Sequence, residues 1–123
     1  MDSKNKLEAC SMDFAVNILR VSEQCKGHYT LINQLERSAT SIGANIWEAR
    51  YAHGRADFIA KLQIALKECY ETEYWLELLE CAGLLDSETG TRLLHDYGSL
   101  RRMLVASVTT AKKITELVRY ENG

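Results

Sequence analysis

Apolar residues recur along most of this chain at alternating steps of three and four positions, and no proline interrupts them. An α-helix turns once every 3.6 residues, so each series places its members on one helical face. Four successive series predict helices over residues 4–26, 29–51, 55–82 and 87–119. We therefore expect a chain that is helical over nearly its whole length.

Short turns separate the predicted helices. Glycine, which commonly ends a helix, lies at each of the three junctions, with Gly83 at the last. Asp86 or Ser87 is placed to cap the helix that follows. Because short connections make neighbouring helices antiparallel, we expect residues 1–123 to form one all-α domain, an antiparallel up-down four-helix bundle. Its predicted core is Phe14, Ile18, Leu35, Ile42, Ile46, Phe58, Leu62, Leu76, Leu104 and Val108.

The composition favours a folded chain that acts without a membrane. Hydrophobic residues make up 46% and charged residues 26%, which is unlike a disordered chain. No apolar run reaches the length of a membrane span, and the first residues lack the apolar segment of a signal peptide, so we expect a cytoplasmic protein. Fifteen Lys and Arg stand against 17 Asp and Glu, and this balance argues against a strongly basic nucleic-acid binder.

The third predicted helix is apolar on more than one side. Tyr70, Tyr74 and Trp75 lie beside its main apolar series. A bundle helix needs one apolar face for its core, so the surplus indicates a partner, most simply another copy of the chain. The alternative is a central helix that is deeply buried. Trp47 on the second helix is a further candidate for such an interface between copies, because it lies next to Arg50.

No catalytic or metal-binding motif stands out. Phosphate-loop, dinucleotide and nucleophile-elbow fingerprints are absent, and so are the Glu-x-x-His motifs of di-iron bundles. We therefore expect no enzyme activity, no cofactor, no metal and no small-molecule substrate. The acidic residues of the third helix are expected to pair with basic residues such as Arg37, Arg50 or Arg55.

Two basic doublets lie in the last predicted helix. They are Arg101-Arg102 and Lys112-Lys113. If several copies align, these side chains form a candidate nucleic-acid patch; the alternative is an ordinary solvated helix face.

The segment from Gln34 to Ala49 reads QLERSATSIGANIWEA. It resembles the Q-L-x-R-A-x-x-S-I-x-A-N-I-x-E signature of the bacterial four-helix bundle family, also called the 23S rRNA intervening-sequence proteins. The resemblance continues through RADF from Arg55, IALKE from Ile64 and ETEYWL from Glu71. It implies a small bacterial protein, a homopentameric ring and no catalytic residues. Relatives serve as accessory proteins of diversity-generating retroelements, where they associate with a reverse transcriptase and nucleic acid.

The sequence departs from that signature at three positions. Gly43 stands where proline is frequent, Trp47 where alanine is usual, and Ala49 where glycine is usual. Trp47 adds bulk at a position that is expected to face a neighbouring copy, so the ring geometry is expected to change. The retroelement accessory proteins are also markedly basic, whereas this chain has a net charge of −2.

Several polar positions match the family signature, and we hypothesise that they form a polar network that ties the second helix to the third. In this network Arg55 is expected to pair with a nearby carboxylate, Glu48 or Asp57. The seven positions are Ser41, Asn45, Glu48, Arg55, Asp57, Glu68 and Glu71.

The resulting functional prediction is a non-enzymatic, self-assembling scaffold or adaptor for a macromolecular partner. One alternative is an accessory subunit that binds a reverse transcriptase and RNA or DNA. A second alternative is a small metal-dependent enzyme on a bundle scaffold.

Overall fold

The computed structural model describes residues 3–122, and these form four helices without a strand. They are α1 (Ser3–Gln24), α2 (Tyr29–Ala49), α3 (Arg55–Cys81) and α4 (Ser87–Asn122). The helices begin within one residue of the predicted positions. The first three end one or two residues early, whereas α4 continues three residues beyond its predicted end.

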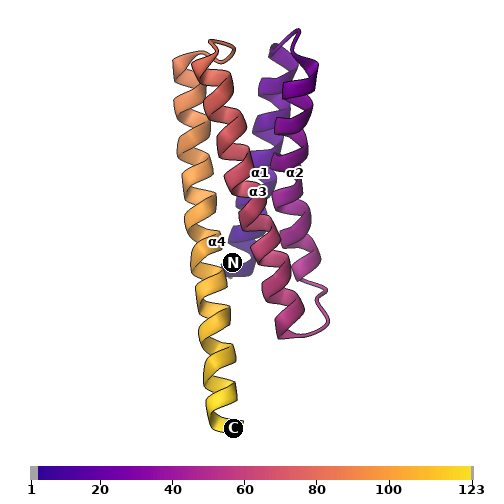
Figure 1. Cartoon of the computed structure of the whole chain (residues 1–123), viewed down its shortest axis with the longest axis vertical. Helices are drawn as coiled ribbons and strands as arrows, with labels where there is room; N and C mark the ends of the chain where they lie inside the picture. Colours follow the sequence, from indigo (N-terminus) through magenta and orange to yellow (C-terminus); the bar gives the residue numbers. More distant parts are fainter. Residues whose placement is uncertain (1–2, 123) are drawn as a thin grey trace.

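The four helices form an up-down bundle in which each helix packs against two others (Figure 1). Helix α2 lies between α1 and α3, and α4 closes the bundle by contacting both α3 and α1. The pairs α1 and α3, and α2 and α4, are therefore diagonal. This arrangement confirms the predicted all-α four-helix fold.

The core contains nine of the ten predicted side chains, including Phe14, Ile18 and Leu62. The exception is Phe58, which is half-buried because it lies in the first turn of α3, near the end of the bundle. At the start of α4, Leu93 is buried, whereas the adjacent Leu94 is half-buried.

The turn between α3 and α4 shows why the chain reverses where the sequence predicts. Gly83 has a φ of 74°, a left-handed conformation that costs glycine little. The amide of Leu84 donates to the carbonyl of Leu79 over 2.9 Å, and that of Gly83 donates to Glu80 over 3.0 Å, which is a Schellman motif. Asp86 then caps α4 by accepting the amide of Thr89 over 2.8 Å.

Helix α4 is 36 residues long, whereas the other three contain 21 to 27 residues. At 1.5 Å per residue it spans about 54 Å. Its C-terminal part extends past the other helices at the lower end of the bundle (Figure 1). We call residues 111–122 the α4 arm; it starts beside the first turns of α3 and continues beyond them.

Candidate functional site

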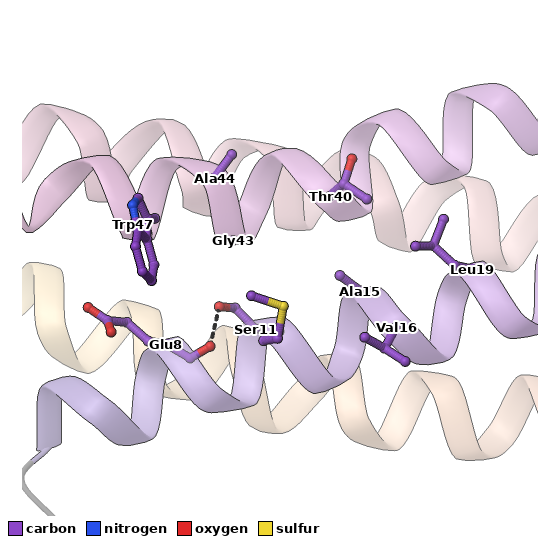
Figure 2. Close-up of a pocket in the computed structure, with 10 residues that line it drawn as sticks. Glu8, Ser11, Ala15, Val16, Leu19, Thr40, Gly43, Ala44 and Trp47 are labelled. Atoms are coloured by element: carbon purple, nitrogen blue, oxygen red, sulfur yellow. Dashed lines mark hydrogen bonds between the residues drawn. The ribbon is translucent and has the colours of Figure 1, made fainter.

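An apolar groove lies between α1 and α2 (Figure 2). It encloses about 350 Å³. We call it the α1–α2 groove. It is lined by Glu8, Ser11, Met12, Ala15, Val16, Leu19, Thr40, Gly43, Ala44 and Trp47.

Small residues form the floor of the groove. A Cβ atom added to Gly43 would lie 3.4 Å from the Oγ atom of Ser11, so the two helices approach closely here. The Ser11 hydroxyl donates to the Glu8 carbonyl of its own helix over 2.9 Å and does not bridge to α2. The large side chains lie at the rim, where Met12, Leu19 and Trp47 are 43% to 58% exposed. The groove is therefore an apolar surface that the single chain leaves open to solvent.

Ionic contacts fix the Trp47 end of the groove. The Arg50 guanidinium lies 4.5 Å from the centre of the Trp47 ring, a cation–π arrangement. Its Nε atom donates to Glu8 Oε1 over 3.0 Å, and its Nη2 atom pairs with Glu8 Oε2. These hydrogen bonds raise the pKa of Arg50. The Glu8 carboxylate, the one ionisable group that lines the groove, is thus held by Arg50, which directly follows α2.

The predicted interface residues divide between separate surfaces. Trp47 belongs to the groove, whereas Tyr70 and Tyr74 are exposed on α3, which does not contact α1. Trp75 is half-buried and packs against the core. The Tyr74 ring meets it edge-on, with the ring centres 5.0 Å apart.

The structure does not assemble the predicted polar network. The Asn45 amide donates to the Ser41 carbonyl over 2.8 Å, which is a contact within α2. Glu48 pairs with Lys61 of α3 at 3.1 Å, and the predicted pair with Arg55 is not formed. Asp57 instead accepts the amide of His53 over 3.0 Å, in the turn that precedes α3.

The other two members of that network, Glu68 and Glu71, bind Arg37 from α2. Arg37 Nη1 lies 3.4 Å from Glu68 Oε2, and Nη2 pairs with Glu71 Oε2. Partial burial raises the pKa of Glu68, the adjacent Glu71 raises it further, and Arg37 opposes both effects. Arg37 is one of the basic partners that the sequence indicated for the acidic residues of α3.

A buried contact between α2 and α3 was missed at the sequence level. The Thr72 hydroxyl donates to Ser38 Oγ over 2.9 Å, and the Ser38 hydroxyl in turn lies 3.2 Å from the Leu35 carbonyl. Both side chains are fully buried. The helical register placed Thr72 among the apolar core positions, and nothing in the pattern indicated that its hydroxyl would find a serine on α2.

The basic doublets of α4 form two sites and not one cluster. They are eleven residues apart, which is three helical turns and about 16 Å along the axis. The Arg101 guanidinium lies 6.0 Å from the Tyr97 ring, whereas Arg102 donates to Ser99 Oγ over 3.3 Å. Lys112 and Lys113 are exposed on the α4 arm.

Three further observations concern the rest of the bundle. Within residues 3–122, His, Cys, Asp and Glu side chains do not gather in groups of three that could hold a metal ion. Burial raises the pKa of the Cys69 thiol to about 12, so this thiol is protonated near neutral pH. None of the described helices has the length and apolar character needed to span a bilayer.

Comparison with known proteins identifies the family of this bundle. A model of the 23S rRNA-intervening sequence protein family matches residues 3–106. The chain belongs to this family. A crystal structure of a protein of unknown function from the S23 ribosomal protein family of Bacteroides thetaiotaomicron VPI-5482 is similar, with a TM-score of 0.83 and 39% sequence identity. The match covers 88% of this chain and 99% of that one. Curated proteins gave no match.

Some of the features described above lie inside the residues that match the family model, and others lie beyond them. In this 23S rRNA-intervening sequence protein the whole α1–α2 groove lies inside the matched residues. The exposed tyrosines of α3 also lie inside them. The α4 arm, which begins at Ala111, lies beyond their end at residue 106.

Proposed function

We propose that this protein is a non-enzymatic, cytoplasmic scaffold that assembles with copies of itself through the α1–α2 groove. The observation that supports this function is the open apolar groove, with Met12, Leu19 and Trp47 exposed at its rim. Methionine and tryptophan are enriched at protein interfaces, and exposed apolar surface of this kind is costly to leave in water.

A second copy is the occupant that suits the rest of the molecule. Tyr70 and Tyr74 are exposed one turn apart on α3, on the far side of the bundle from α1. Tyrosine supplies both an apolar ring and a hydroxyl group that can stay in contact with water, so this pair is suited to an apolar groove that is open to solvent. We infer that the tyrosine face of one copy enters the groove of the next.

Such a contact joins two different surfaces and is therefore heterologous. A heterologous contact closes into a ring when its rotation permits, and otherwise gives an open filament. The family resemblance argues for the closed form with five copies. The charge of the groove fits a binding role better than a catalytic one, because its one carboxylate, Glu8, is held by Arg50.

The experiment is a light-scattering mass on a sizing column. We expect the wild-type chain to assemble into rings of five 14.0 kDa protomers, so that its native mass is a whole multiple of the mass of one five-copy ring. The variant Met12→Glu/Leu19→Glu places charge at the groove and is expected to be a monomer. The control Thr91→Glu carries a charge at an exposed position of α4 and should keep the wild-type mass. A wild-type monomer, or an assembly that the groove variant leaves intact, would refute the proposal.

Mixing two variants tests whether the contact is heterologous. A copy with the groove variant still has its tyrosine face, and a copy with Tyr70→Glu/Tyr74→Glu still has its groove. Each alone should be monomeric, and an equimolar mixture should form a dimer of two 14.0 kDa chains. A mixture that stays monomeric would contradict the tyrosine-in-groove arrangement.

The retroelement accessory role is a second candidate, and it is favoured only by the exposed lysines of the arm. If the protein has this role, nucleic acid detected by its absorbance should co-elute with the assembly and be removed by salt, since phosphate contacts weaken steeply with ionic strength.

A further inference from the structure

The α4 arm carries an apolar surface that its own chain does not cover. Ile114, Leu117 and Val118 are all exposed, and Leu117 is 63% exposed. Ile114 shares a shallow hollow with Phe58 and Ala111 at the end of the bundle. The three exposed side chains lie within two turns of one another and form one continuous apolar stripe.

The position of this stripe explains why it is uncovered. Upstream on α4, Met103 lines a hollow together with Lys6 and Cys10 of α1. Ile114 follows Met103 by eleven residues, or three turns, so it lies on the same side of the helix. Helix α1 begins at Ser3 and covers only the upstream part, whereas the arm continues past the bundle (Figure 1).

The arm also lies beyond the residues that match the family model. The family match ends at residue 106, and the similar crystal structure is covered almost completely by only 88% of this chain. The arm therefore lies beyond the part of the chain that the family model matches, and its apolar stripe calls for an occupant of its own.

We propose that the α4 arms of two copies pair with each other in antiparallel orientation. When Ile114 of one arm lies opposite Leu117 of the other, and the reverse, the two apolar stripes cover each other. In this register Lys113 lies within one turn of Glu121 of the partner copy, about 4.5 Å along the axis. Neither side chain has an ion-pair partner among the described residues of its own chain. A parallel pair would instead place like charges side by side.

This pairing rests on the proposed ring. A cyclic ring carries all its arms on one face, so two rings can join face to face through their arms. One pair of short helices is too small an interface to be stable alone. Several arm pairs between the same two rings reinforce each other, because each pair that forms raises the effective concentration of the remaining arms for one another.

The test is the native mass of the full chain and of arm variants. We expect the wild type to have twice the mass of one ring, and Leu117→Asp to have the mass of one ring. The control Lys112→Gln makes the same change in net charge on the α3-facing side of the arm and should keep the doubled mass.

A charge reversal tests the orientation without touching the apolar stripe. Lys113→Glu should weaken the doubling, and Lys113→Glu/Glu121→Lys should restore it. If the wild type is a single ring whose mass Leu117→Asp does not change, the arm proposal is wrong and the ring stands. If no ring forms, both proposals fail. If the double reversal does not restore the doubled mass, antiparallel pairing is wrong.

Discussion

The buried hydrogen bond between Thr72 and Ser38 allows a quantitative test of how α2 and α3 are joined. Thr72→Val keeps the shape of the side chain but removes the hydroxyl that lies 2.9 Å from Ser38 Oγ. Ser38 keeps its contact with the Leu35 carbonyl, so no buried donor is left without an acceptor. The expected loss is then that of one net hydrogen bond, about 1 kcal/mol.

Helix propensity would obscure single measurements, so the experiment is a double-mutant cycle. Ser38→Ala gains helix propensity while it loses the hydroxyl, and Thr72→Val changes propensity little. The cycle with Thr72→Val/Ser38→Ala cancels these intrinsic effects and leaves the coupling between the two side chains, which we expect to be about 1 kcal/mol. At about 0.26 kcal/mol/K for the entropy of unfolding of a chain this long, that corresponds to about 4 °C in Tm.

Urea unfolding followed by circular dichroism measures the coupling. Protein concentration must be the same for all four proteins, because self-association stabilises the folded state by mass action. A coupling below about 0.3 kcal/mol, which is within the error of additive sites, would refute the reasoning. It would mean that the contact between the two hydroxyl groups adds little to the stability of the fold, as expected if each hydroxyl proton goes to a carbonyl of its own helix, that of Glu68 for Thr72 and that of Leu35 for Ser38.

Three further outcomes are expected. Gly43→Ala should raise Tm by about 4 °C, since alanine stabilises a helix by about 1 kcal/mol relative to glycine and its Cβ would lie 3.4 Å from Ser11 Oγ without a severe clash. An unchanged or lower Tm in a thermal melt would show that the close approach of the two helices tolerates no methyl group. The cap hydrogen bonds lower the pKa of Asp86 from 3.8, so its stabilisation of the fold is present above that pH and lost as the pH falls through the lowered value. The difference in stability between wild type and Asp86→Ala should therefore shrink in thermal melts at acid pH, and a constant difference would contradict this. A thiol reagent at pH 8 should modify the exposed Cys81 quickly and the buried Cys69 only on unfolding, because burial raises the pKa of Cys69 to about 12; rapid modification of both would show that the core opens.

The fold could be predicted because its determinants are periodic and local. The register of Leu62, Cys69 and Leu76 defines the buried face of α3 whatever that helix packs against. Asp86 marks the start of α4 through a contact with a residue only three positions away. Phe58 has the same periodicity but lies at the end of the bundle, and periodicity carries no information about where neighbouring helices stop.

The candidate site was predicted less well because its contacts depend on the rotation and axial offset of neighbouring helices. Arg37 and Arg55 are equivalent partners for an acidic α3 residue when only composition is considered, yet the register of α2 against α3 brings Arg37 to Glu71. Similarly, Trp75 is the larger aromatic residue, but its side of α3 turns toward the core, while the less conspicuous Met12 lies exposed at the groove.

Two of the three departures from the family signature lie in the groove. Gly43 and Trp47 both line it, the first at its floor and the second at its rim, whereas Ala49 is buried in the core. Gly43 lies where α1 and α2 approach closely, and Trp47 adds an exposed ring that Arg50 holds in place. Both changes alter the shape of the surface that a neighbouring copy would contact, and neither removes a core contact. If the groove is the ring interface, the changes adjust how copies meet while the protomer stays the same.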